Sequence, residues 1–264
     1  MDSLILYLLA GSLAGLIGGL FGLGGGAVVV PVLIYCFKLG GVNEEVLTHL
    51  AIGTSLATIV VTSLSSIYTH HRKAAVLWPV TLWMVPGIGL GVVAGSVFAT
   101  ELSGSTLQNL FGAFLIFVAF QMALGGSPKP HRELPGRLVG TGNGAGIGFV
   151  SGIFGIGGGS LSVPYLAYCN VNITNAIATS AALGFPIALL GALTYIYRGW
   201  QVTGLPEGAL GFVFLPAFLG IVVTSVPFAR LGALLAHRLP AKHLKRLFAV
   251  VALGLGVGFI SSNS

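Results

Sequence analysis

Ten apolar segments follow one another along the chain, separated by short polar or glycine-rich stretches. They lie at about 4–20, 27–37, 47–69, 76–98, 107–124, 138–153, 160–169, 176–197, 208–230 and 246–262. An α-helix needs about 20 apolar residues to cross a bilayer, and most of the segments approach that length. Two of them, 27–37 and 160–169, are only about half as long. The pattern predicts an all-α integral membrane protein in which some helices are broken.

The chain divides into two similar halves at a polar loop. Residues 125–137 hold three prolines and three basic side chains, which is typical of a linker. This predicted cytoplasmic linker separates a first membrane repeat, 1–124, from a second, 138–264. Residues 15–36 align without gaps to 148–169 with 12 identities in 22 positions. The sequence therefore predicts an internal duplication, and two-repeat membrane bundles are usually transporters.

The composition excludes a soluble enzyme. Apolar residues make up 55% of the chain and charged residues only 7%, against about 25% charged in soluble domains. The net charge of +6 comes from short loops, so it indicates membrane orientation rather than a nucleic-acid surface. Glycine is abundant, at 41 residues, and membrane helices use it where backbones approach closely.

The distribution of basic residues favours inverted repeats. If the segments flanking each glycine cluster form one broken span, the halves share one orientation and the 12 Lys and Arg divide six to six. If those segments return to the side where they start, the repeats are inverted, and only Lys38 and Arg198 lie on the outer side. The other side then holds Arg72, Lys73, Lys129, Arg132, Arg137, Arg230, Arg238, Lys242, Lys245 and Arg246. Because basic residues gather in the cytoplasm, we expect inverted repeats with both termini outside.

Each half carries a glycine cluster that is expected to break a helix near the middle of the membrane. The clusters have the pattern Phe-Gly-x-Gly-Gly-Gly, at 21–26 and 154–159. A helix that restarts after three glycines presents unpaired N–H groups and its positive dipole end to a cavity, and these bind anions without a charged side chain. Two inverted copies bring two such ends together. The predicted substrate-binding residues are Gly24, Gly25, Gly26, Ala27, Gly157, Gly158, Gly159 and Ser160.

The alternative for these clusters is that the glycines only permit tight helix crossing. A side chain at Gly25 or Gly158 distinguishes the two ideas, because it blocks close backbone approach to an anion. Gly11 lies away from the break, so a side chain there is expected to be tolerated better.

Two hydroxyl pairs recur at matching positions. Thr54 and Ser55, near the start of the long helix after the first cluster, match Thr179 and Ser180 in the second half. As uncharged donors they suit a site that binds an oxyanion and must also release it, so all four are predicted substrate-binding residues. The alternative is that each hydroxyl bonds the carbonyl one turn back.

Arginines and cysteines also recur in pairs. Arg72 matches Arg198, and inversion puts one at each mouth, where they would steer an anion inward or snorkel to the membrane interface. Cys36 matches Cys169, and both are read as buried apolar fillers, with a thiol role in a sulfur pathway as the alternative.

The sequence offers no catalytic, metal or cofactor site. No carboxylate lies within a predicted span, which argues against a carboxylate proton relay or a cation site. The histidines His49, His70 and His71 have no second ligand group at metal spacing, so we expect no metal.

The doubled Phe-Gly-x-Gly-Gly-Gly motif, followed by Pro31 and Pro164 and by Thr-Ser in the next helix, resembles the sulfite exporter TauE/SafE family. These proteins are also called TSUP, the 4-toluene sulfonate uptake permeases. The resemblance covers essentially the whole chain. It implies transport of small sulfur-containing anions, such as sulfite or organosulfonates, across the bacterial cytoplasmic (inner) membrane. It carries over to the glycine triplets and, with them, to the two Thr-Ser pairs.

Together these features predict two inverted-topology repeats, each with a Gly-rich broken or re-entrant helix pair followed by three transmembrane helices. The expected function is secondary transport of a small sulfur-containing oxyanion by alternating access, with no cofactor, no nucleic-acid partner and a proton as the candidate coupling ion. The alternatives are an anion channel and a membrane sulfur-relay protein that uses Cys36 and Cys169.

Overall fold

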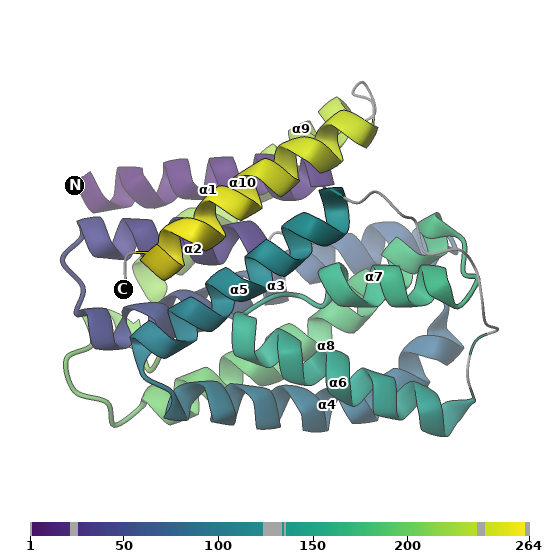
Figure 1. The fold of residues 1–264 in the computed structure, drawn as a ribbon, viewed down its shortest axis with the longest axis horizontal. Helices are drawn as coiled ribbons and strands as arrows, with labels where there is room; N and C mark the ends of the chain where they lie inside the picture. The colour runs from purple at the N-terminus through teal and green to yellow at the C-terminus, as the bar shows by residue number, and fades with distance from the viewer. Residues whose placement is uncertain (1, 22–25, 124–133, 135, 237–240, 262–264) are drawn as a thin grey trace.

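The computed structural model is a bundle of helices that includes one short β-hairpin (Figure 1), and it describes residues 2–21, 26–123, 134, 136–236 and 241–261. The helices are α1 (Asp2–Phe21), α2 (Gly26–Leu39), α3 (Glu44–Arg72), α4 (Trp78–Glu101), α5 (Gly104–Ala123), α6 (Arg137–Phe154), α7 (Gly159–Tyr168), α8 (Ile173–Gly199), α9 (Leu215–Ala236) and α10 (Ala241–Ser261). Among the described residues, α3, α4, α5 and α8 include stretches long and apolar enough to cross a membrane. The predicted all-α membrane class is confirmed.

The helices before and after the loop at 125–137 follow the same order. In each set the second helix is short, with 14 residues in α2 and 10 in α7. The third is long, with 29 residues in α3 and 27 in α8. Contacts cross between the sets, because α1 packs along α9, α4 along α6 and α5 along α10. Each half therefore completes the packing of the other.

The long helices α3 and α8 pack against each other and run antiparallel. Near the start of α3, a Cβ added to Gly53 would lie 3.1 Å from Cβ of Tyr195, near the end of α8. At the other end, Val76, just after α3, shares a buried cluster with Ala178 near the start of α8. Two helices at matching places in the two halves thus point in opposite directions.

Glycines bring several helix backbones into direct contact. On α4, Gly87, Gly91 and Gly95 are spaced four apart, and a Cβ at each would collide with a backbone carbonyl of α6. Small residues at this spacing are the usual way for membrane helices to approach closely. On α4, glycine therefore serves to let two helices pack closely, which is the alternative considered for the glycine clusters.

Gly11 belongs to another close contact, between α1 and α9. A Cβ at Gly11 would lie 2.6 Å from the Cα and 2.9 Å from the carbonyl oxygen of Ile221. A side chain at Gly11, expected to be tolerated better than one at Gly25 or Gly158, would therefore meet backbone atoms that cannot make room without moving a whole helix.

The second half contains an extra element between α8 and α9. The corresponding connection from α3 to α4 spans only residues 73–77, whereas this one spans 200–214. It contains β1 (Ala209–Leu210) and β2 (Val213–Phe214), which pair antiparallel. The apolar segment predicted at 208–230 thus joins two structures, a hairpin and the start of α9.

The hairpin tip is buried between the start of α3 and the end of α8. Phe212 is 5% exposed, and its ring stacks on His49 at 5.2 Å between centroids. Its N–H donates to the carbonyl oxygen of Tyr195 (3.2 Å), and the Tyr195 ring meets the Phe212 ring edge to face. The hairpin therefore fills this end of the bundle.

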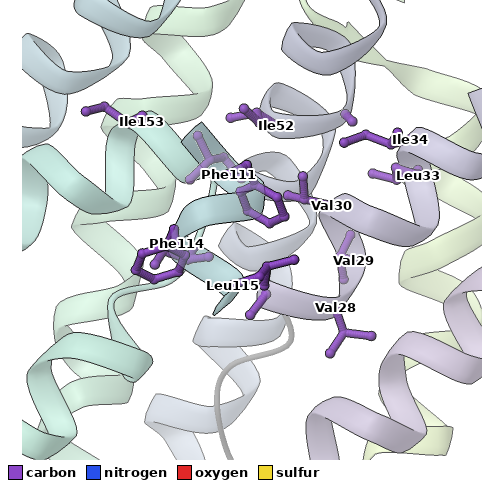
Figure 2. Packing of buried hydrophobic residues seen from close by; sticks show 14 of the residues in the cluster. Val28, Val29, Val30, Leu33, Ile34, Ile52, Phe111, Phe114, Leu115 and Ile153 are labelled. Carbon is purple, nitrogen blue, oxygen red and sulfur yellow. The ribbon is translucent and has the colours of Figure 1, made fainter. Parts of the chain in front are cut away.

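An apolar core surrounds α2 and α5 and supports the second glycine cluster. Figure 2 shows Phe111 and Leu115 of α5 in the same buried cluster as the valines of α2, with Phe114 on the side away from these valines. Phe114 also stacks on Phe154, with 4.6 Å between ring centroids. Because Phe154 is the last residue of α6, this aromatic pair anchors the point where the helix breaks.

Candidate functional site

The second glycine cluster breaks a helix, as predicted. Gly155 follows the last residue of α6 with φ +65°, and Gly158 precedes α7 with φ +74°. Glycine adopts this left-handed conformation readily, whereas other residues do so at a cost. The helix that restarts at Gly159 has only 10 residues. The two positive-φ glycines thus turn the chain between α6 and a half-length helix.

The first cluster is described at one of its predicted site glycines. α1 ends at Phe21 and α2 begins at Gly26, while Gly24 and Gly25 lie outside the described residues. A Cβ on Gly26 would lie 2.9 Å from the carbonyl oxygen of Gly155 and 2.9 Å from Cα of Ile156. The start of α2 therefore touches the break of the other half. We call this contact the glycine junction.

A cavity of about 260 Å³ adjoins the glycine junction. Gly157, Gly159 and Ser180 line one part of it. The rest of its wall comes from α1, α2, α3, α8 and α9, through Ala14, Gly15, Val29, Thr58, Ile59, Thr62, Ser63, Ser66, His70, Ile177, Ala181, Gly184, Ile221, Ser225 and Ala229. None of these described lining residues is Asp, Glu, Lys or Arg. The wall thus combines hydroxyl groups with small apolar side chains.

One face of α3 supplies a polar stripe along the cavity. Thr58, Thr62, Ser66 and His70 all line it and are spaced four residues apart, which places them on one helix face. Thr58 is buried, whereas the other three are partly exposed. The cavity therefore runs from the buried glycine junction toward the surface at the His70 end of α3.

The matching face of α8 is apolar. In the register that pairs Thr54 with Thr179, which is shifted by one residue from the one that pairs Arg72 with Arg198, the counterparts of the stripe are all buried. They are Leu183, Ile187, Gly191 and Tyr195. The Tyr195 hydroxyl donates to the carbonyl oxygen of Gly152 (3.3 Å). The matching faces of α3 and α8 thus differ in polarity, and only the α3 face lines the cavity with all four of its residues. The sequence reasoning missed this stripe, although its four-residue spacing in an apolar helix was a readable signal.

The predicted threonines lie next to the cavity wall but bond the backbone. The Thr54 hydroxyl accepts the N–H of Phe214 (2.9 Å), and the Thr179 hydroxyl accepts the N–H of Leu77 (3.0 Å). These N–H groups lie just before α9 and α4, so each threonine holds the start of a helix of the other half. Both threonines are fully buried. Neither lines the cavity.

The predicted serines bond the glycine junction itself. Ser55 donates to the carbonyl oxygen of Gly155 (2.9 Å). Ser162 donates to the carbonyl oxygen of Gly158, and since its single hydrogen is used there, Ser180 donates to Ser162 (2.7 Å). The Ser55 hydroxyl thus satisfies a carbonyl oxygen at the break, and the Ser180 hydroxyl supports the serine that bonds Gly158.

Two other serines near the junction have hydroxyls without a partner. Ser225 lines the cavity and Ser160 lies in the first turn of α7; each is 6% exposed, and neither Oγ has a hydrogen-bond partner among the described residues. At the start of α7, the N–H groups of Leu161 and Ser162 donate to the carbonyl oxygen of Gly158, and no side chain caps the helix. Ala27, the counterpart of Ser160 in α2, is buried. The junction therefore offers unused donors beside a cavity.

The two predicted steering arginines lie at opposite ends of the α3–α8 pair and outside the cavity wall. Arg72 is exposed, and its guanidinium lies over the Tyr68 ring at 5.8 Å. Arg198 forms an ion pair with Glu101 and donates from Nε to Thr100 (3.0 Å). Arg198 thus ties the end of α8 to the end of α4.

The two cysteines at matching positions in the halves are buried and lie away from the cavity wall. Cys36 and Cys169 are 5% and 4% exposed, and neither lines the cavity wall. Within the part of the chain that the structure describes, no group of three His, Cys, Asp or Glu side chains could hold a metal ion.

This fold and site define a helical membrane protein with a cavity, lined by hydroxyl and apolar side chains, beside the break between α6 and α7. The family model for the sulfite exporter TauE/SafE matches residues 7–259. The chain belongs to this family of membrane transporters.

Three relatives are similar over nearly their whole length, and each is named a probable membrane transporter protein. The relative from Haemophilus influenzae is 37% identical over 250 residues, covering 94% of both chains. One from Xylella fastidiosa is 30% identical over 97% of this chain and 95% of its own. One from Methanocaldococcus jannaschii is 28% identical over 93% of this chain and 91% of its own. No solved structure matches the chain.

Proposed function

We propose that this protein is a secondary transporter that moves a small sulfur-containing oxyanion, such as sulfite or an organosulfonate, by alternating access. The observation that carries the proposal is the cavity at the glycine junction. Its described wall holds hydroxyls and no carboxylate, and α7 begins beside it, at Gly159, without a side-chain cap. Neutral donors at a helix N-terminus are suited to an anion. The oxyanion is proposed to bind there.

We further propose that residues 1–124 and 138–264 are inverted repeats. The antiparallel run of α3 and α8 supports this, because they are the third helices of the two halves. The reciprocal bonds of Thr54 to the start of α9 and of Thr179 to the start of α4 support it as well. Inverted repeats of this kind enclose a substrate site at their interface.

The proposed orientation puts the His70 end of the cavity in the cytoplasm of a bacterial inner membrane. Arg72 and Lys73 lie at that end, whereas Glu44, Glu101 and Glu207 lie toward the other end, near Arg198. The positive-inside tendency assigns the basic end to the cytoplasm.

The same orientation puts both termini outside. Tyr7 of α1 packs on Phe37 near the end of α2, and Phe259 of α10 packs on Tyr35. The start of α1 and the end of α10 therefore lie on the same side of the bundle (Figure 1).

The hairpin favours a transporter over a channel. It fills the outer end between α3 and α8 through Phe212, while Arg198 ties α8 to Glu101 beside it. A cavity that reaches the surface at one end and is filled at the other is what alternating access requires. The outer end would open when the hairpin withdraws and the ion pair separates. A cysteine relay has less support, because Cys36 and Cys169 do not line the cavity.

The test is uptake and counterflow in proteoliposomes with sulfite, thiosulfate, sulfate, sulfoacetate and taurine. Saturable counterflow is expected of a transporter, whereas a channel gives flux without it. Ser225→Ala removes a cavity hydroxyl that has no protein partner, so it should weaken anion binding by about 1.5–3 kcal/mol without lowering stability. Ser65→Ala is the control, because Ser65 is exposed and does not line the cavity. Unchanged binding by Ser225→Ala would contradict the proposed site.

A further inference from the structure

His70 differs from the other residues that line the cavity. It is the only titratable side chain among the described lining residues, and it ends the polar stripe on α3. It is half-buried, so it lies where the cavity reaches the surface. The hydroxyls of Thr58 and Thr62 donate to carbonyl oxygens of α3 itself. Within the stripe, only His70 can supply a positive charge.

The groups that face His70 across the cavity are uncharged. From the other helices the wall consists of Ala14 and Gly15 of α1, Val29 of α2, Gly157 and Gly159 at the break, Ile177, Ser180, Ala181 and Gly184 of α8, and Ile221, Ser225 and Ala229 of α9. Among the residues whose side chains the structure describes, its charged or titratable neighbours are on its own segment, at positions 71–73.

Those neighbours point elsewhere or lie beyond the helix. His71 accepts a hydrogen bond from the indole N–H of Trp78 (3.2 Å), and Arg72 lies over Tyr68. Lys73 follows the last residue of α3. None of the three lines the cavity. Among the described lining residues, an anion in the cavity would therefore meet one ionisable group.

We propose that protonated His70 binds the transported anion at the mouth of the cavity, so that anion binding at this end takes up one proton. The proposal rests on the proposed transport function. An oxyanion held in a partly dry cavity needs charge compensation, and the imidazolium ring supplies it together with two N–H donors. The imidazole nitrogen takes the proton from solution, and no covalent bond to the anion forms or breaks.

The proposal predicts the direction of the pH effect. The anion stabilises the charged form of His70, and by linkage the protonated form must bind the anion more tightly. Apparent affinity should therefore fall as the pH rises through the titration of His70, by at most about tenfold per pH unit. The matching position on α8 is Tyr195, which is fully buried and bonded to Gly152. The proton site would thus serve only the His70 end.

The experiment is isothermal titration calorimetry of the purified full chain in detergent between about pH 5.5 and 8, where histidine titrates. Sulfate and sulfoacetate are suitable probes because their charge is constant in this range, unlike that of sulfite. Comparing two buffers with different ionisation enthalpies measures the protons taken up on binding. The parent is expected to take up close to one proton at the upper end of the range.

Two variants and one control decide the outcome. His70→Gln should bind weakly at every pH and take up no proton, and His70→Lys should bind with little pH dependence and no proton uptake. His71→Gln should behave as the parent, because His71 faces Trp78. If His70→Gln keeps the proton uptake and pH dependence of the parent, the role of His70 is refuted while the anion site stands. If the folded parent binds neither probe nor any anion of the uptake panel, the transport proposal fails, and this one with it.

Discussion

The roles of the predicted hydroxyls can be separated by replacing Thr54 and Thr179 with valine. Valine has nearly the same shape as threonine but lacks the oxygen that accepts the N–H of Phe214 or of Leu77. Each substitution therefore leaves a backbone N–H without its partner. A structural role predicts a loss of stability, whereas a substrate role predicts a loss of anion binding.

The expected magnitude follows from the burial of each bond. An unsatisfied buried donor costs about 1–3 kcal/mol. The Thr54 bond is fully buried and the Thr179 bond is partly buried, so Thr54→Val should approach the upper end of that range and Thr179→Val the lower. In a protein of this size a change of about 1 kcal/mol moves Tm by about 2–4 °C.

The assay is thermal unfolding of detergent-purified variants with and without saturating anion, at one fixed scan rate because membrane proteins often unfold irreversibly. We expect both valine variants to unfold at lower temperature and to retain the anion-dependent rise in Tm. Thr54→Ser keeps the acceptor oxygen, so its Tm should stay closer to that of the parent. The Ser225→Ala variant should show the opposite result, with parent-like Tm and a smaller rise.

One result would refute this reasoning. If Thr54→Val unfolds at the temperature of the parent but loses the anion-dependent rise, the Thr54 hydroxyl binds the anion and its bond to Phe214 contributes nothing measurable.

Three other predictions concern the hairpin, the break and the orientation. Phe212→Ala should lower the free energy of unfolding by about 3–5 kcal/mol, because it empties the buried tip of the hairpin; a Tm equal to that of the parent would show that the hairpin is not packed there. Gly158→Ala should cost at least about 1–2 kcal/mol, since its φ is +74° and the new Cβ would lie 2.6 Å from Cδ1 of Ile187. Gly146→Ala, with open space around it, should be neutral or stabilising, and equal effects at the two glycines would contradict this. In a background lacking native cysteines, a cysteine at position 103 should react with impermeant reagent from outside and one at 131, outside the described residues, from the cytoplasm; labelling of both from one side would refute the inverted orientation.

The helical scaffold could be predicted from the sequence because its signals are local. Apolar segments near 20 residues and a glycine pattern repeated at 21–26 and 154–159 define helices and a break without any tertiary information. The end of α6, the turn at Gly155 and Gly158 and the short α7 follow from that pattern. The segment at 208–230 was misread because an apolar hairpin and an apolar helix look alike when no polar residue separates them.

The roles of Thr54 and Thr179 could not be predicted from local patterns. Their partners are 160 and 102 residues away in the sequence, and the bonds exist only because each half holds a helix start of the other. A repeated Thr-Ser pair is consistent with a ligand site and with a structural bond alike. The close contact of Gly11 with Ile221 could not be predicted for the same reason, since it is also between the halves.

The polar stripe on α3 was missed for a different reason, which concerns how duplicated chains acquire function. Comparing the halves selects features that both copies keep, and those features, the glycine clusters and the Thr-Ser pairs, mostly build the junction. The stripe ending at His70 has apolar counterparts ending at Tyr195, so a comparison that asks for identity discards it. Yet a transporter must bind and release its substrate under different conditions on its two sides. Residues that differ between matched helix faces are therefore where such directionality is expected, and His70 is the difference that can take up a proton.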